Sequence, residues 1–220
     1  MSSKPDYTLP VTPKSWANQS SLSQWDWNDI PPLSPFRLYN DSQLASHTTT
    51  TRVCCNQQAL YLRYDCTDHD IWGTYTKRDE PIYDEEVVEI FIGHGADDPT
   101  HYYEFQVSPN GVLFDAAIHN PTSTRADLTV DTSWDCKGIQ WLAERNDADN
   151  HWMAIMVILW DAIAPTDSVP TIWRANFYRI ERPRDGEPEY SCWSPTIAEP
   201  ADFHKPAYFG TLRLPDFSQI

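Results

Sequence analysis

The sequence has little glycine, few basic residues and no long hydrophobic run. Glycine numbers only 7 in 220 residues, less than half of its usual frequency of about 7%. This scarcity argues against glycine-rich phosphate loops, and no GxGxxG or GxSxG motif occurs. The longest apolar run, Trp152 to Trp160, is nine residues. A membrane-spanning helix needs about 18 or more, so this run indicates a buried strand.

Positive charge is the second shortage. Lysine and arginine total 16 against 32 aspartates and glutamates, which gives a formal net charge of −16. Such a field repels phosphate backbones and anionic lipids, so we expect neither nucleic acid nor a membrane as a partner. Neutral or cationic molecules and divalent ions remain. Residues 1–7 lack the apolar segment of a signal peptide, so we expect a cytoplasmic protein.

Cysteine and histidine give no metal or disulfide framework. The five cysteines form an odd set without CxxC spacing, and the seven histidines match no zinc pattern. Free thiols in a reducing compartment are the expectation.

From residue 50 onward, short segments with alternating hydrophobicity predict a series of strands. The clearest are 59–66, 87–92 and 102–108, and a Pro-Asn-Gly turn at 109–111 predicts a hairpin to 112–118. We expect the residues on one face of these strands to be buried: Leu60, Leu62, Val88, Ile90, Phe105 and Val107. Further candidate strands are 138–144, 152–160, 172–180, 190–193 and 208–214.

This pattern predicts an all-β fold, an antiparallel β-sandwich of jelly-roll or immunoglobulin-like type with about ten strands. We expect residues 1–220 to form a single domain, since no linker or repeat is visible. Residues 1–50 are rich in proline, serine, threonine and asparagine, which indicates an irregular part. They also carry Trp16, Trp25 and Trp27, so we expect this part to pack on the sandwich.

Polar side chains share the outward face of two strands that we expect to be neighbours. Glu89 lies on the first strand, and Glu104, Gln106 and Ser108 lie on the second. Three aromatic residues, Tyr83, Trp72 and Trp193, are candidates to flank this platform. Aromatic rings beside carboxylate and amide groups are typical of a sugar site, because pyranose faces stack on the rings while hydroxyls bond to the polar groups. The alternative is that the aromatics are core and the acids a solvated face.

Three other interpretations remain open. Glu89 and Glu104 are a candidate acid–base pair of a weak glycoside hydrolase, although an open sheet face would not raise the pKa of either. Met153 and Met156 are candidate axial ligands of a b-type haem, with core packing as the alternative. Acidic loop residues are candidate Ca²⁺ ligands: Asp68, Asp70, Asp84, Asp97 and Asp98.

An ordered set of segments resembles carbohydrate-binding module family 9, and most closely its stand-alone branch. The segments are 59–68, 83–92, 102–110, 152–163, 173–180, 190–195 and 203–214. The resemblance implies an antiparallel β-sandwich that binds the reducing end of a glycan between two aromatic rings. It also implies no enzymatic activity, no required cofactor and, as in many members, structural calcium.

The resemblance assigns roles to individual residues. Tyr83 and Trp193 match the two stacking positions, and Glu89 matches the strand carboxylate that bonds sugar hydroxyls. Gln106 and Ser108 fall where an arginine and an asparagine are usual. We add Glu104, Trp72, Arg174 and Asn176 as further expected sugar contacts. The expected function is non-catalytic carbohydrate binding, with a monosaccharide or oligosaccharide as the partner.

Overall fold

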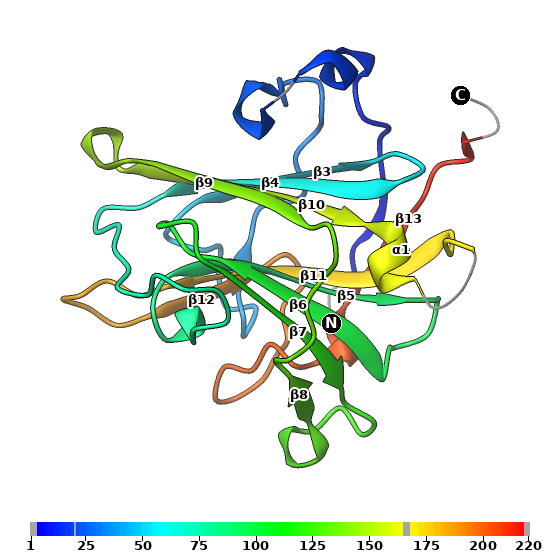
Figure 1. The fold of residues 1–220 in the computed structure, drawn as a ribbon. Coiled ribbons are helices and arrows are strands. Elements are labelled where there is room, and N and C mark those ends of the chain that lie inside the picture. The colour runs from blue at the N-terminus through cyan, green and yellow to red at the C-terminus, as the bar shows by residue number, and fades with distance from the viewer. Residues whose placement is uncertain (1–3, 20, 165–167, 218–220) are drawn as a thin grey trace.

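The structure of the chain is a computed structural model, and it describes residues 4–19, 21–164 and 168–217. Two β-sheets face each other and enclose the main hydrophobic core (Figure 1). Every strand pair is antiparallel except that of β1 with β13. The predicted antiparallel β-sandwich is therefore confirmed. The described residues form thirteen strands rather than about ten, because three short strands extend the larger sheet.

The smaller sheet has the strand order β3-β4-β10-β9. Its strands are β3 (Thr49–Cys55), β4 (Ala59–Thr67), β9 (Gln140–Asn146) and β10 (His151–Leu159). The larger sheet has the order β1-β13-β11-β5-β6-β7-β8, with β12 paired to β11 and β2 paired to β12. Its strands are β1 (Asp6–Thr8), β2 (Arg37–Leu38), β5 (Val87–His94), β6 (His101–Val107), β7 (Leu113–His119), β8 (Thr129–Asp131), β11 (Ile172–Glu181), β12 (Glu189–Cys192) and β13 (Gly210–Arg213).

Helical structure is limited to single turns. One short α-helix, α1 (Trp160–Ile163), follows β10. The 3-10 turns are η1 (Lys14–Asn18), η2 (Leu22–Gln24), η3 (Ile82–Asp84), η4 (Arg125–Asp127), η5 (Asp147–Asp149) and η6 (Pro206–Tyr208). Across the described ranges, no helix has the length and hydropathy that crossing a membrane requires.

The core between the sheets follows from the period-2 alternation of the strands. All six residues predicted to be buried are fully inaccessible: Leu60, Leu62, Val88, Ile90, Phe105 and Val107. Burying one such side chain stabilises the fold by about 1.5–3 kcal/mol. A one-residue slip of any of these strands would move its apolar set to the opposite face, so the alternation also fixes the register.

The outer face of the larger sheet is also covered. On β5, Glu89 and Phe91 point away from the main core, yet both are almost fully buried. A second apolar cluster lies on this face, built from residues such as Phe114, Tyr178 and Phe203. The segment before β13 supplies Phe203, whose ring stacks on Tyr178 with 4.2 Å between centroids. This face is therefore partly roofed, and the roof defines the cavity described below.

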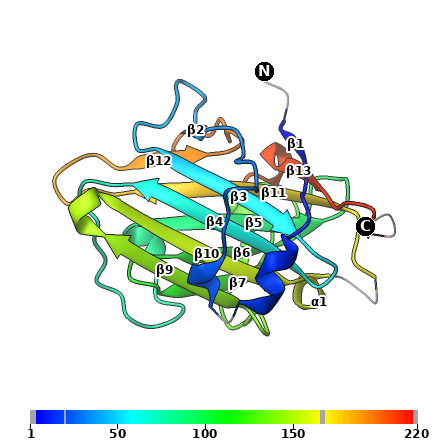
Figure 2. The same cartoon turned by 90° about the horizontal axis from the view of Figure 1, so that it is seen from above.

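The N-terminal part lies across the outer face of the smaller sheet, as the view from above shows (Figure 2). Trp16 and Trp27 are buried there against Met153 and Ile155 of β10. The rings of Trp16 and Trp25 stack with 4.8 Å between centroids and 4° between planes. Large aromatic residues thus hold an otherwise irregular segment on the sheet.

The two methionines considered as haem ligands lie on opposite faces of β10. Met156 packs in the core between the sheets, whereas Met153 packs under the N-terminal part. They cannot coordinate one iron together, so the core-packing alternative is confirmed. The five cysteines are free and buried, as expected. Burial raises the pKa of the Cys66 thiol to about 12, which makes it unreactive at neutral pH.

Candidate functional site

A cavity of about 460 Å³ lies against the outer face of the larger sheet. Its walls come from strands β5, β6 and β7, from the β7–β8 connection, from the β11–β12 hairpin and from the segment before β13. The lining residues are Tyr83, Glu89, Phe91, Glu104, Gln106, Phe114, Arg125, Leu128, Val130, Thr132, Ile180, Arg182, Tyr190, Ala201, Phe203 and His204. The volume suits one or two sugar rings or another small ligand.

Three polar side chains form the cavity floor: Glu89, Glu104 and Gln106. Glu89 on β5 lies directly opposite Gln106 on β6, and Glu104 precedes Gln106 by two residues and therefore shares its face. Gln106 donates a hydrogen bond from Nε2 to the Glu104 carboxylate, which leaves Gln106 Oε1 buried without a partner. The expectation that these residues form one polar group holds, but the group lies in a recess and is nearly inaccessible.

Burial changes the protonation of this floor. It raises the pKa of Glu89 well above its ordinary value, and the nearby Glu104 charge adds to the rise. Burial likewise raises the pKa of Glu104 to about 7. The pKa of His204 falls to about 4 because burial, followed by the positive charge of Arg125, disfavours its charged form. Burial therefore favours the neutral form of Glu89, and His204 is neutral at neutral pH. The expectation of an open face that leaves both carboxyl groups unperturbed was wrong.

Aromatic rings border the cavity on both sides of the floor. Tyr83 lies on η3 and is 41% exposed, with its ring edge-to-face against Phe114 of β7 at 5.6 Å. Tyr190 lies on β12, which pairs with β11 on the side away from β5, and is half-buried. Its hydroxyl accepts a hydrogen bond of 2.9 Å from Nη2 of Arg182. Tyr83 and Tyr190 are thus the tyrosines available for stacking in this cavity.

Trp193 does not reach the cavity, and its predicted stacking role was wrong. It is 5% exposed and packs in the main core with Phe177, at 5.5 Å between ring centroids. Its ring also lies over Gly210, where an added Cβ would stand 2.3 Å from the indole. Alternation explains the difference, because Tyr190 and Cys192 share the cavity-side face of their segment and Trp193 has the opposite parity.

Ser108 and Trp72, two more predicted sugar contacts, lie outside the cavity. Their polar groups form hydrogen bonds within the fold. The Ser108 hydroxyl accepts a hydrogen bond from the backbone N–H of Val112 at 3.2 Å and so stabilises the β6–β7 turn. The Trp72 indole donates to the backbone oxygen of Arg182 at 2.6 Å. Both assignments to a sugar site are therefore corrected.

Arg174 and Asn176 share the correct face of β11 but are covered by the segment that follows β12. Asn176 donates to the backbone oxygen of Ser194 at 2.7 Å and accepts from the N–H of Ser194 at 3.0 Å. Arg174 donates to Thr211 at 2.8 Å and pairs with Asp98 at 3.2 Å. These bonds use the groups that would have contacted a ligand, so both assignments are corrected.

Comparison with known proteins agrees with this geometry. The family model described as carbohydrate-binding family 9 matches residues 39–214. The chain belongs to this family. The resemblance inferred from the sequence motifs is therefore confirmed.

One curated protein and three solved structures are similar to this chain, and the structures share its fold. A curated "extracellular protein" of Arthroderma benhamiae is 29% identical over 171 residues, covering 73% of this chain and 76% of that protein. A candidate carbohydrate-binding protein of Bacteroides uniformis has the same fold, with a TM-score of 0.74, 19% identity and coverage of 97% and 100%. A family 9 module of Caldicellulosiruptor kristjanssonii in complex with glucose has a TM-score of 0.67, 14% identity and 98% coverage of both chains. The same module in complex with cellotriose gives 0.64.

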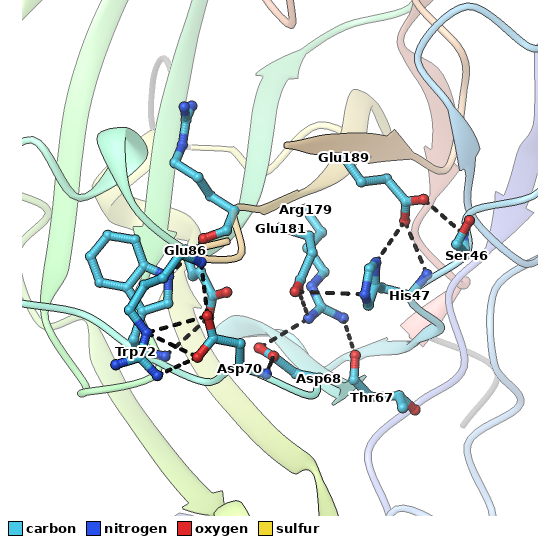
Figure 3. Close-up of polar contacts among 12 residues, drawn as sticks. Ser46, His47, Thr67, Asp68, Asp70, Trp72, Glu86, Arg179, Glu181 and Glu189 are labelled. Atoms are coloured by element: carbon cyan, nitrogen blue, oxygen red, sulfur yellow. Dashed lines mark hydrogen bonds and ion pairs between the residues drawn. The ribbon is translucent and has the colours of Figure 1, made fainter. Parts of the chain in front are cut away.

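The calcium that family 9 resemblance implied finds no free ligand set in the described residues. Asp68, Glu86 and Glu181 are buried with their carboxylate oxygens within 4.8 Å of one another. However, Arg179 already lies among them and pairs with Asp68 and with Glu181, as Figure 3 shows. A guanidinium therefore holds the place that a cation would take, and the set does not fit Ca²⁺. We call these four residues the Arg179 cluster.

Most of the other acidic candidates also form ion pairs with an arginine or lysine. Asp79, Asp115 and Asp135 also lie within 4.8 Å of one another, and all three pair with Arg78. Asp70 pairs with Arg184, and Asp98 pairs with Lys4 and Arg174. Asp84 and Asp97 are exposed and belong to neither of these two groups among the described residues.

Sequence reasoning missed the basic residues and the second tyrosine that line the cavity: Arg125, Arg182, His204 and Tyr190. Tyr190 had a usable signal, because it lies in the quoted 190–195 motif and pairs with Ile180 across β11 and β12. Alternation from Ile180 would have placed it on the cavity side. Arg125 and His204 come from irregular segments, in which no periodicity predicts direction.

Proposed function

We propose that this cavity binds the end of a glycan, or a small sugar, without catalysing a reaction. The observation that carries the proposal is the recessed floor of Glu89, Glu104 and Gln106 bordered by Tyr83 and Tyr190. A sugar ring offers apolar C–H faces and a rim of hydroxyls, and this cavity offers rings and hydrogen-bonding groups to match. Family membership supports the proposal, as do the sugar complexes of the Caldicellulosiruptor module.

The protonation of the floor defines what it can bind. Neutral Glu89 donates one hydrogen bond and accepts others, while Glu104 near its pKa of about 7 accepts from hydroxyls. Gln106 Oε1 has no partner and is a further acceptor. Sugar hydroxyls act both as donors and as acceptors, so they satisfy such a mixed floor better than a purely cationic or apolar ligand would.

Isothermal titration with glucose, xylose, cellobiose and xylobiose tests the proposal. Tyr83→Ala should weaken binding by about 1–3 kcal/mol, by analogy with ring stacking elsewhere. Tyr75→Ala is the matched control, because Tyr75 lines a different surface hollow and should leave affinity unchanged. Trp193→Phe perturbs the core and should lower the melting temperature without changing affinity. Absence of binding across a broad glycan panel would refute the proposal.

Glycoside hydrolysis is the second candidate function. One observation favours it: burial keeps Glu89 protonated while Glu104 titrates near neutrality, which is the division that an acid and a base require. Incubation with the sugars that bind, followed by reducing-end analysis, decides between the two. If the wild type forms product and Glu89→Gln does not, the function is hydrolysis and not binding alone.

A further inference from the structure

Arg182 differs from every other arginine of the chain. Each of the others forms an ion pair with an aspartate or glutamate. Among the described residues, Arg182 forms none, although acids outnumber bases two to one. A guanidinium that remains without a carboxylate in so acidic a protein has a charge available for a ligand.

The position of Arg182 makes that charge accessible to the cavity. The residue directly follows β11, lines the cavity and is half-buried. Its Nη2 donates to the hydroxyl of Tyr190, and its guanidinium lies 5.8 Å from the centroid of that ring. Its Nε is buried and has no hydrogen-bond partner. The side chain is therefore held in place by Tyr190 while part of its donor fork stays unused.

The charge balance around the cavity favours an anion at this end. Arg125 also lines the cavity, but it pairs with Asp202 at 3.1 Å. Glu104 lies on β6, separated from β11 by β5. In the strand register, Glu104 lies opposite Phe91 and Phe91 lies opposite Asn176, six residues before Arg182. Two strand spacings and six residues along the strand place Glu104 and Arg182 roughly 20 Å apart. An anionic group near Arg182 can thus avoid Glu104 while the rest of the ligand reaches the floor.

We infer that the cavity recognises a sugar bearing a carboxylate, a uronic acid, whose carboxylate binds Arg182 and whose hydroxyls face Glu89 and Gln106. A carboxylate is planar and accepts two parallel hydrogen bonds, which matches the geometry of a guanidinium fork. Tyr190 orients the fork, so little side-chain entropy is lost on binding. This inference rests on the proposed function and narrows its substrate class.

The test compares glucuronic acid with its methyl ester, since the ester keeps the ring and removes the charge. Titration of the full chain should show the acid binding at least about tenfold more tightly, because hydrogen bonds to charged groups are the stronger ones. In Arg182→Gln this preference should disappear, with the affinity for the ester little changed. Arg184→Gln is the matched control, because Arg184 pairs with Asp70 outside the cavity and should keep the preference.

Two outcomes would overturn the inference. Equal or tighter binding of the ester would show that the cavity does not recognise the carboxylate charge. An equal loss of both ligands in Arg182→Gln would show that Arg182 only supports Tyr190. In either case neutral sugars still bind and the proposed function stands, whereas binding of neither ligand nor any neutral sugar would remove both.

Discussion

The chain buries two groups of carboxylates, and they are built differently. In the Arg179 cluster, three acids surround one arginine, and the Trp152 indole and the Trp72 backbone N–H also donate to them. In the cavity floor, Glu89 and Glu104 form no ion pair with an arginine or lysine among the described residues, and their closest basic group is a neutral histidine at 3.8 Å. The first group carries its own cation in addition to a protonated Glu86, whereas the second has no cation and relies on protonation.

This difference indicates which carboxylate group stabilises the fold and which one can bind a ligand. A buried carboxylate is tolerated when it is paired, hydrogen-bonded or protonated. In the Arg179 cluster the ion pairs meet these needs for Asp68 and Glu181, whereas Glu86, whose pKa burial raises to about 9, is protonated and keeps Oε1 unpartnered. No cavity of the described residues is lined by this cluster. The cavity floor meets them only in part, since Gln106 Oε1 is unpartnered. Unmet hydrogen-bonding capacity beside open volume is what a polar ligand can fill.

The largest expected effect is from removing the internal cation. Arg179→Met keeps the approximate volume but leaves Asp68 and Glu181 buried without their partner. We expect a loss of about 3–5 kcal/mol in the free energy of unfolding, measured by urea denaturation. Arg184→Met is the control, since the Arg184–Asp70 pair is exposed, is screened by solvent and contributes little to stability. Equal small losses in both variants would show that the Arg179 cluster is not structural.

A matched pair of substitutions sharpens the contrast. Glu89→Leu should lower sugar affinity by about 1–3 kcal/mol through lost hydrogen bonds, while stability stays the same or rises. Glu181→Leu should do the reverse, because it takes a partner from Arg179 and because Glu181 itself does not line the cavity. Titration and denaturation of both variants check this. If Glu89→Leu unfolds the protein and Glu181→Leu abolishes binding, the two roles are reversed.

The pH dependence of stability should show the part played by protonation in the floor. The pKa of Glu104 is about 7 in the folded chain and about 4.5 when unperturbed. The folded state therefore holds this proton more tightly, so its contribution is complete below about pH 4.5 and is lost as the pH rises toward 7 and above. We expect the titration of Glu104 alone to lower the free energy of unfolding by about 1–3 kcal/mol between pH 5 and pH 8.

Glu104→Gln should remove part of this fall, since the amide does not titrate. Glu181, whose pKa is also about 7 because of burial, contributes a similar fall that Glu104→Gln leaves in place. Thermal melts of the wild type and of Glu104→Gln at several pH values separate the contribution of Glu104 from that of Glu181. A pH profile that is identical in wild type and Glu104→Gln would contradict the raised pKa.

The sequence predicted the fold well because alternation is a local signal. The burial of Val88, Ile90, Phe105 and Val107 and the pairing of β5 with β6 followed directly from it. The polar floor was found for the same reason. What lies over the outer face depends on contacts distant in sequence, such as Phe203 on Tyr178. No periodicity encodes those contacts, so the roof and the raised pKa values were missed.

The errors in the candidate site share one physical cause. Residue type alone does not say whether a polar or aromatic group is already used. Asn176 was chosen for its amide, but Ser194 occupies both ends of it. Trp193 was chosen for its ring, but strand parity turns it into the core. Arg182 was overlooked because its unpaired state becomes visible only when every other arginine is placed.

The smallest expected effect concerns calcium, and it tests whether a guanidinium replaces a metal ion. In both acidic groups that have metal-like spacing, an arginine already pairs with the carboxylates. A ligand specific to the native state raises the melting temperature once its concentration exceeds its dissociation constant. We therefore expect EDTA, and calcium added after EDTA, to leave the melting temperature unchanged within about 1 °C. In Arg179→Met the three carboxylates lose their cation, so calcium should raise the melting temperature of that variant alone. A clear loss of stability of the wild-type chain in EDTA would show that the arginines do not substitute for metal.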